Sequence, residues 1–193
     1  EGMDAVVLAS HVVLACQNAV SRRIDPTSAG VLTIGRIEGG VAENVVADRV
    51  RLEGTIRYFD EAVQGVLHEE LRRALDVARA LGGDAELDLR IGYPPVVNDA
   101  AMTELMSAAT AATLGDDAVA DLEPWMAAED FAYLLREAPG SFAWLGAALD
   151  DPREHHHPRF DIDERALVRG ATVLAASALR ALEEIGSPAP SRT

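Results

Sequence analysis

The stretch RVRLEGTIRYF, residues 49–59, constrains the fold more than any other part of the chain. Its side chains alternate: Val50, Leu52, Ile56 and Tyr58 fall on one face, and Arg49, Arg51, Glu53, Thr55 and Arg57 fall on the other. A period of two is that of a β-strand with one buried and one solvated face. The stretch from Val31 to Ile37 also alternates and is followed by a glycine pair, so the two stretches predict a β-hairpin.

Helical patterns flank this hairpin on both sides. Apolar residues recur at spacings of three and four from Met3 to Arg22, and again between Asp60 and Leu81. Asp60 is suited to cap the second helix, and the glycine pair after Leu81 is suited to end it. A further alternating stretch, AELDLRIGY at residues 85–93, predicts a third strand. The order helix, strand, strand, helix, strand is that of a ferredoxin-like layer that lacks its first strand.

The second half of the chain is richer in helix and poorer in strand. Asn98 or Asp99 is placed to cap a helix that reaches about Thr113, EDFAYLLREAPG predicts a brief helix, and a longer helix begins near Leu167. The stretch SFAWLGA, residues 141–147, is apolar without alternation, which predicts a strand buried on both faces. These strands are too few for a complete sheet, so this half is predicted to be part of a larger α/β domain.

The charge balance argues against nucleic acid and anionic membranes as partners. The 193 residues carry 32 acidic and 17 basic side chains, a formal net charge of −15. Proteins that bind a phosphate backbone concentrate positive charge instead. The apolar runs are shorter than the ~20 residues that a membrane-spanning helix needs. Cys16 has no partner for a disulfide, so we expect a cytoplasmic protein.

The stretch EHHHPRFDIDE, residues 154–164, places three histidines in a row before a proline. A zinc ion usually takes three or four protein ligands, and neighbouring side chains of an extended chain point to opposite sides. Only one imidazole, or the pair His155 and His157, could therefore face one metal ion. The stretch is either a contribution to a metal site or a solvated polar loop, and the residues alone leave both interpretations open.

Six stretches, taken in order, resemble the C-terminal half of a family of amidohydrolases and metallopeptidases. The family includes aminoacylases, hippurate hydrolases, carboxypeptidase G and indole-acetyl-amino-acid hydrolases. The stretches cover nearly the whole chain: GMDAVVLASHVVLACQNAVSRRIDP, IGRIEGGVAENVVADRVRLEGTIRYFD, GYPPVVND, MAAEDFAYLL, PGSFAWLGA and HHHPRFDIDERAL. The resemblance implies metal-dependent hydrolysis of the amide bond in N-acyl amino acids or similar small amides. An aminopeptidase or dipeptidase of the same family, and a noncatalytic dimerisation or interaction module, are the alternatives.

The resemblance also implies a division into two domains. Residues 1–97 are similar to a ferredoxin-like lid that often mediates homodimer formation, and residues 98–193 to the C-terminal part of a zinc-peptidase-like α/β catalytic domain. The expected fold class is therefore α/β with an α+β lid. Two divalent metal ions, zinc or manganese, are expected in the complete enzyme, with a small-molecule amide as the substrate.

The resemblance assigns the histidine stretch a definite role. His156 matches a metal ligand of the family, His157 takes the variable position before Pro158, and His155 is a neighbour. Whether His155 or His157 takes the place of His156 as the ligand stays open at the level of the sequence.

Two further residues match positions that face the substrate in the family. Asn44, in AENVV, would be an amide donor that reaches the substrate or its reacting carbonyl, in some relatives across to a neighbouring subunit; alternatively it is a turn asparagine in an unusual backbone conformation. Glu129, in AAEDF, would contact substrate or order the surroundings of a metal ligand. Alternatively, Glu129 and Asp130 are acids favoured by the dipole of the helix that follows.

The other functional residues of the family do not map onto this chain. The remaining metal ligands and the glutamate that acts as the general base would precede its first residue. We therefore expect no catalytic residue within these 193 residues and no tightly bound metal in the segment alone. The segment is expected to be inactive unless another chain completes the site.

Overall fold

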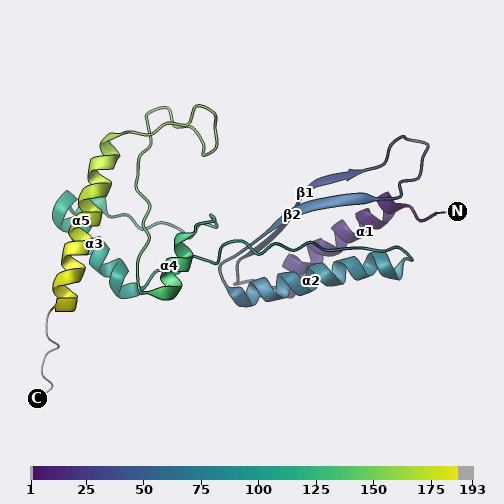
Figure 1. The fold of residues 1–193 in the computed structure, drawn as a ribbon, viewed down its shortest axis with the longest axis horizontal. Coiled ribbons are helices and arrows are strands. Elements are labelled where there is room, and N and C mark those ends of the chain that lie inside the picture. The colour runs from purple at the N-terminus through teal and green to yellow at the C-terminus, as the bar shows by residue number, and fades with distance from the viewer. Residues whose placement is uncertain (1, 187–193) are drawn as a thin grey trace, which may run out of the picture. The chain divides into compact units, whose positions relative to one another are not determined.

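A computed structural model describes residues 2–186 of the chain (Figure 1). These residues divide into two compact units. The first unit runs to Pro95 and includes the segment Trp125–Glu129; the second combines Val96–Pro124 with the chain from Asp130 onward. The expected boundary after residue 97 lies close to the end of the first unit, whereas the return of 125–129 to that unit was not expected.

The first unit contains two helices and a β-hairpin in the order predicted from the sequence. Its elements are α1 (Ala5–Asn18), continued by the π-helical turn η1 (Ala19–Arg23), β1 (Gly30–Gly39), β2 (Val50–Tyr58) and α2 (Glu61–Ala80). Asp4 and Asp60 cap the two helices, since each carboxylate accepts a hydrogen bond from a backbone N–H of the first turn. At the C-terminal end of α2, Gly82 has a φ of +91°, a conformation that suits glycine.

The hairpin is antiparallel and contains one irregularity. Thr33 pairs with Thr55 and Ile34 with Gly54, but the next pair is Arg36 with Glu53, so Gly35 is an extra residue in β1. This is the arrangement of a β-bulge, which bends the strand.

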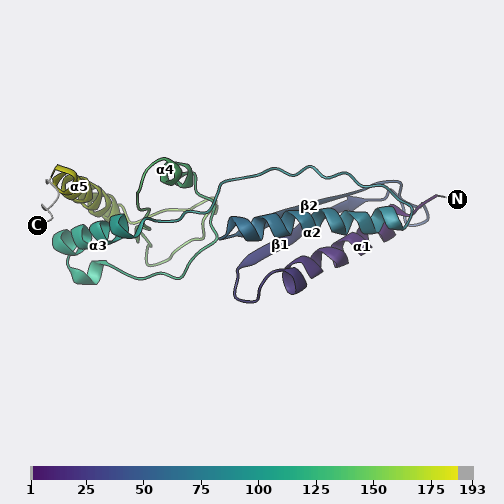
Figure 2. The same ribbon diagram turned by 90° about the horizontal axis from the view of Figure 1, so that it is seen from below.

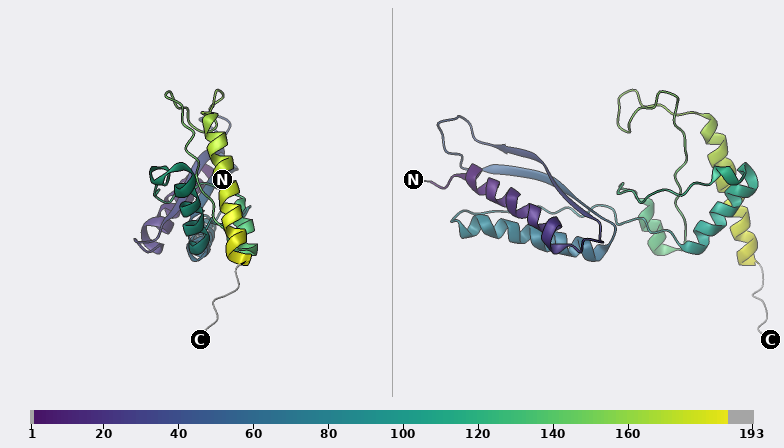
Figure 3. Two further views of the ribbon diagram at one scale, coloured as in Figure 1. Left: turned by 90° about the vertical axis from the view of Figure 1, so that its left-hand side faces the viewer. Right: turned by 180° about the vertical axis from the view of Figure 1, so that it is seen from behind.

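The core of the first unit lies between the two helices and one face of the hairpin. Leu8, Val12 and Cys16 of α1 pack against Ala74 and Ala78 of α2, and a second cluster joins Ala19, Val63 and Leu67. The hairpin residues Leu32, Leu52, Ile56 and Tyr58 pack against these clusters. Both helices therefore cover the same face of the hairpin (Figures 1 and 3), which confirms the alternation predicted from residues 49–59.

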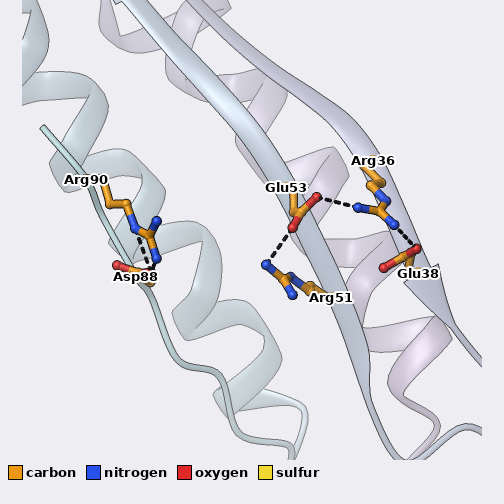
Figure 4. A network of polar contacts seen from close by, with 6 residues as sticks. All are labelled: Arg36, Glu38, Arg51, Glu53, Asp88 and Arg90. Carbon is orange, nitrogen blue, oxygen red and sulfur yellow. Dashed lines mark hydrogen bonds and ion pairs between the residues drawn. The ribbon is translucent and has the colours of Figure 1, made fainter. Parts of the chain in front are cut away.

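Charged side chains line part of the hairpin away from this core. Arg36 forms ion pairs with Glu38 and with Glu53, and the nitrogen–oxygen distance to Glu53 is 3.2 Å. Arg51 forms a further ion pair with Glu53 at 2.6 Å (Figure 4). Their side chains are largely exposed, so solvent screens these pairs and each contributes at most about 1 kcal/mol.

The third strand predicted at residues 85–93 is not formed. In the part of the chain that the structure describes, the sheet has only the strands β1 and β2. The predicted segment is extended and runs beside α2 (Figures 1 and 2), and no backbone hydrogen bond joins residues 86–91 to another segment between residues 2 and 186. The physical reason lies in the split βαβ order, in which the strand after the second helix pairs with the first strand. The described chain contains no strand before α1.

The second unit consists mainly of helices. Its elements are α3 (Ala100–Leu114), the 3₁₀ turn η2 (Asp116–Ala118), α4 (Phe131–Glu137) and α5 (Arg165–Gly186). Asp99 caps α3 by accepting a hydrogen bond from Met102 N, which decides between Asn98 and Asp99 as the cap. The helices α3 and α5 pack against each other (Figure 2).

The strand predicted at residues 141–147 is also not formed in the described chain. The Asn98 side chain takes the place of a neighbouring strand at one point: its Nδ2 donates to Phe142 O at 2.8 Å, and Phe142 N donates to its Oδ1 at 2.9 Å. Phe142 also contacts the rings of Phe131 and Trp144. The segment is thus held by a side chain and by aromatic contacts rather than by a sheet.

One described helix, Ala5–Arg23, has the length and the apolar composition of a membrane-spanning segment, which the inspection of apolar runs did not reveal. One such helix is weak evidence, because a core helix of a globular unit passes the same test. Here Leu8, Val12 and Cys16 of this helix are buried against α2.

Candidate functional site

The histidine stretch folds into two successive β-turns. His157 N donates to Glu154 O at 3.1 Å and closes the first turn, and Phe160 N donates to His157 O at 2.9 Å and closes the second. His156 is the third residue of the first turn and has a φ of +70°. In the described chain it is the only residue other than glycine with a positive φ. This position is that of a type II turn, where glycine or asparagine is usual.

The three imidazoles of this stretch have different surroundings. The ring of His155 packs against Phe160, with 5.3 Å between the ring centroids. The Nδ1 atom of His157 accepts a hydrogen bond from Arg159 N at 3.1 Å. His156 is exposed, and its side chain makes no hydrogen bond or ring contact with another residue of the described chain.

The histidine stretch is tied down on its C-terminal side. Asp163 N donates to Ala147 O at 2.9 Å, and the Asp163 carboxylate accepts hydrogen bonds from Arg165 at the start of α5. These hydrogen bonds and the charge of the guanidinium lower the pKa of Asp163. The carboxylate therefore stays ionised, and it fixes the point at which the loop enters α5.

The residues that surround His156 do not form a metal site of their own. Within residues 2–186, no group of three or more His, Cys, Asp or Glu side chains is arranged to hold a metal ion. His156 nevertheless fits a metal as one donor, because its imidazole is exposed and engaged by no neighbour in the described chain. Cys16 does not fit, because it is buried in the core and burial raises the pKa of its thiol.

Asn44 lies in the loop that joins β1 to β2. Val45 N donates to Ala42 O at 3.2 Å, so Asn44 is the third residue of a β-turn. Its φ is not positive, so the structure does not support the interpretation as an asparagine in an unusual backbone conformation. The Asn44 side chain is exposed, and its amide makes no hydrogen bond within the described chain.

Glu129 directly precedes the short helix α4 and is half-buried. It belongs to the segment Trp125–Glu129, which is attached to the hairpin by a hydrogen bond from the Arg57 guanidinium to Met126 O. The first turn of α4 contains no acidic residue, and the Asp130 carboxylate makes no capping hydrogen bond. Asp130 is nevertheless the N-cap residue of α4 and Glu129 directly precedes it, so both acids lie where the helix dipole favours negative charge.

Within the first unit, Asn44 and the segment of Glu129 lie far apart. Asn44 lies at the loop end of the hairpin, whereas Arg57, which binds the segment of Glu129, lies at the opposite end of β2. Seven residues of strand between Val50 and Arg57 span about 23 Å. His156 belongs to the other unit.

Sequence reasoning missed the part that His157 plays in the loop. Its imidazole accepts a hydrogen bond from Arg159 N within the second turn, and this role leaves no signature in the order of three identical residues. Pro158 is the only local signal, because proline favours the second position of a β-turn.

Comparisons with known proteins agree with the resemblance described above. Residues 7–180 match the model of peptidase family M20/M25/M40. The N-acetyl-L-cysteine deacetylase of Bacillus subtilis is 39% identical over 184 residues, which are 94% of this chain and 43% of that protein. The N-acetyldiaminopimelate deacetylase of Streptococcus thermophilus is 36% identical over 170 residues, 86% of this chain and 44% of that protein. The chain thus spans less than half the length of these curated relatives.

Solved structures are also similar to this chain. The Bacillus subtilis YxeP protein, described as a dinuclear metal binding peptidase from the M20 family, superposes with a TM-score of 0.76 at 31% identity, over 94% of this chain and 47% of that one. The aminopeptidase PepT of Bacillus cereus superposes with a TM-score of 0.67 at 20% identity, which supports the fold alone. The predicted fold class and the resemblance are both confirmed.

Proposed function

The chain belongs to peptidase family M20/M25/M40, and from this membership we propose that it is part of a metal-dependent hydrolase that cleaves the amide bond of N-acyl amino acids or similar small amides. The names of the relatives favour this substrate class, because two relatives above 35% identity are deacetylases of N-acetylated amino acids. An aminopeptidase or dipeptidase is less well supported, because the aminopeptidase neighbour is only 20% identical.

His156 is the proposed metal ligand of this segment. The observation that carries the proposal is its exposed imidazole, which no described neighbour engages, on a backbone held at positive φ. Unfavourable backbone conformations cluster at functional sites. The chemistry that a pair of divalent ions, zinc or manganese, supplies in such enzymes is polarisation of the scissile carbonyl and activation of water. His156 would hold one of these ions together with ligands that the described chain does not supply.

Asn44 is proposed to donate a hydrogen bond to the substrate carbonyl as negative charge develops on its oxygen. Its exposed, unengaged amide supports this role. Glu129 is proposed to contact the substrate or to order the surroundings of a metal ligand; its half-buried position just before α4 is compatible with either role.

We further propose that the first unit is the lid domain, that the second is the C-terminal part of the catalytic domain, and that the protein is a cytoplasmic homodimer formed through the lid. Exposed apolar residues near the loop end of the hairpin support an interface there. They are Ile37, Val41, Val45 and Val46, with Val41 89% exposed. Such a grouping of exposed apolar side chains is typical of a contact surface.

The test is hydrolysis of N-acetyl amino acids and of free dipeptides by the complete protein loaded with zinc or manganese. We expect activity on the N-acetyl amino acids and its loss in His156→Ala, with His155→Ala as the matched control that stays active. The 193-residue chain alone should be inactive and should retain no stoichiometric metal after dialysis. Cleavage of dipeptides but not of N-acetyl amino acids would contradict the substrate class, and full activity of His156→Ala would contradict the assigned ligand.

A further inference from the structure

We propose that His157 is a positioning residue, which sets the direction of the His156 imidazole without binding the metal itself. The proposal rests on the assignment of His156 as a ligand. His157 takes part in both turns of the loop: its N–H closes the first, and its C=O accepts the hydrogen bond that closes the second. Any residue could supply these two backbone groups.

The imidazole of His157 supplies a third group, which is specific to its side chain. Its Nδ1 accepts a hydrogen bond from Arg159 N at 3.1 Å. A ring nitrogen that accepts a hydrogen bond carries no proton, so the neutral ring carries its proton on Nε2. Nδ1 is then engaged by the backbone, and Nε2 has no free lone pair for a metal. In this form His157 is not a ligand.

The hydrogen bond between Arg159 N and His157 Nδ1 affects the backbone conformation of the neighbouring residue, His156. A residue with a Cβ atom avoids positive φ, and His156 is held at +70°. The backbone of His156 is fixed on one side by the turn that begins at Glu154 and on the other by His157. If the contact between His157 and Arg159 is lost, the second turn loosens and His156 can relax to negative φ. Its imidazole then points elsewhere.

The side chain at position 157 must place a hydrogen-bond acceptor at a fixed distance from the backbone. The acceptor must be bonded to Cγ, as Nδ1 is in histidine. Asparagine offers Oδ1 at the same place, glutamine offers its oxygen one carbon further out, and alanine offers none. Asparagine should therefore replace histidine here, and alanine and glutamine should not.

The experiment measures zinc affinity in the complete enzyme for the variants His157→Ala, His157→Gln, His157→Asn and His155→Ala. We expect the zinc Kd to rise roughly tenfold for the alanine and glutamine variants, the range seen when a residue that orients a metal ligand is removed. His157→Asn should restore the affinity of the parent protein. His155→Ala is the matched control, since the ring of His155 packs against Phe160, and the zinc Kd of this variant should not change.

A second readout uses the 193-residue chain without metal. Hydrogen exchange of the Arg159 amide should be slow in the parent chain and in His157→Asn, and faster in His157→Ala and His157→Gln. If the alanine variant fails to fold, the comparison of His157→Asn with His157→Gln still tests the positioning role. Both side chains carry an amide and differ in one methylene group.

The outcomes separate this inference from the proposed function. If His156→Ala lowers zinc affinity and His157→Ala and His157→Gln do not, His156 is a ligand and the positioning role is refuted. The inference is also refuted if His157→Asn behaves as His157→Ala does. If His156→Ala leaves zinc affinity unchanged, the assigned ligand itself is wrong, and the inference falls with it.

Discussion

His156 holds a backbone conformation that disfavours every residue with a Cβ atom. The left-handed region costs such a residue about 1–2 kcal/mol, whereas glycine adopts it freely but loses more chain entropy on folding. We therefore expect His156→Gly to stabilise the chain by up to about 1 kcal/mol, measured by urea denaturation of the second unit. Stability would thus rise in the same variant that removes the proposed metal ligand.

His155 provides the control for that prediction. It is the second residue of the same turn, does not have a positive φ, and packs its ring against Phe160. His155→Gly should therefore destabilise the chain. If both glycine variants lower the free energy of unfolding, the backbone of His156 is not held in the left-handed region in solution.

His68 on α2 makes stability depend on pH. Partial burial, followed by the charge of Arg72, lowers the pKa of His68 below its ordinary value of 6.5. The folded chain thus binds fewer protons than the unfolded chain as the pH falls below 6.5. The stabilising contribution is complete above that pH and is lost as the pH falls through the folded-state pKa. We expect the urea midpoint of the first unit to drop between pH 7.5 and pH 5.5, and to drop less in His68→Gln.

Two carboxylates make stability depend on pH in a separate, more acidic range. Hydrogen bonds from Thr27 lower the pKa of Asp25 below its ordinary value of 3.8, and hydrogen bonds from Arg165 do the same for Asp163. Their contribution is present above that value and is lost as the pH falls below it. They do not contribute to the change expected for His68. A drop of the same size in His68→Gln would show that another group is responsible.

At the level of single residues, the sequence predicted the composition of the site but not its conformation. It indicated that three adjacent histidines cannot converge on one metal, and the two turns of the loop agree with this. The positive φ of His156 goes together with hydrogen bonds that join the neighbouring His157 to Glu154, Arg159 and Phe160, none of which a pattern of residue types reveals. The cap at Asp99, by contrast, was among the predicted candidates, because a cap depends only on neighbours along the chain.

At the level of elements, Gly54 and Gly35 form a matched pair in the hairpin. A Cβ atom on Gly54 would lie 2.2 Å from Thr33 O of the facing strand, whereas nothing lies within 4 Å of a Cβ on Gly35. Forcing a methyl group into such a contact typically costs about 1–3 kcal/mol. We expect Gly54→Ala to lower the free energy of unfolding of the first unit by that amount.

Gly35→Ala should have the opposite sign or no effect. Gly35 does not have a positive φ, so alanine can adopt its conformation and should stabilise the strand by about 0.4–1 kcal/mol through the unfolded chain. Circular dichroism during thermal unfolding would measure both variants. Equal destabilisation by both would contradict the register of the hairpin and the place of its bulge.

Helices were predicted better than strands because their hydrogen bonds are local. The helix α1 was predicted from spacing, α2 from spacing and its cap, and the two paired strands from alternation. Residues 85–93 and 141–147 also have the composition of strands, but a strand needs a neighbour for its backbone groups. Composition alone cannot tell whether that neighbour is present in the same chain.

At the level of the whole molecule, the two units differ in the size of their cores. The buried apolar residues of the first unit include Leu8, Val12, Val63 and Leu67, whereas among the residues described in the second they are Leu105 and the three alanines Ala109, Ala132 and Ala166. Large apolar residues of α5 are instead exposed, at 57–72%: Leu167, Val168, Leu174, Leu179 and Leu182. Because burial of apolar surface drives folding, we expect the second unit to unfold at the lower urea concentration.

The two tryptophans allow this expectation to be measured. Trp125 belongs to the first unit and Trp144 to the second, so Trp125→Phe and Trp144→Phe each leave one fluorescent reporter. The transition reported by Trp144 should precede that reported by Trp125. The change Gly54→Ala should move the Trp125 transition only. A single transition shared by both reporters would mean that the units unfold together.

The hairpin described above has consequences for how the chain behaves in concentrated solution. Within the described residues, β1 and β2 pair only with each other, so each strand keeps one edge of backbone N–H and C=O groups that no other strand covers. Neither strand contains proline or lysine, so the features that oppose strand addition are the bulge at Gly35 and the arginines and glutamates of the two strands. Where these features do not protect the edges, we expect the hairpin to act as a template on which a further strand from another molecule adds. Light scattering that rises with protein concentration is the expected sign, and a strand supplied to the open edge should suppress it.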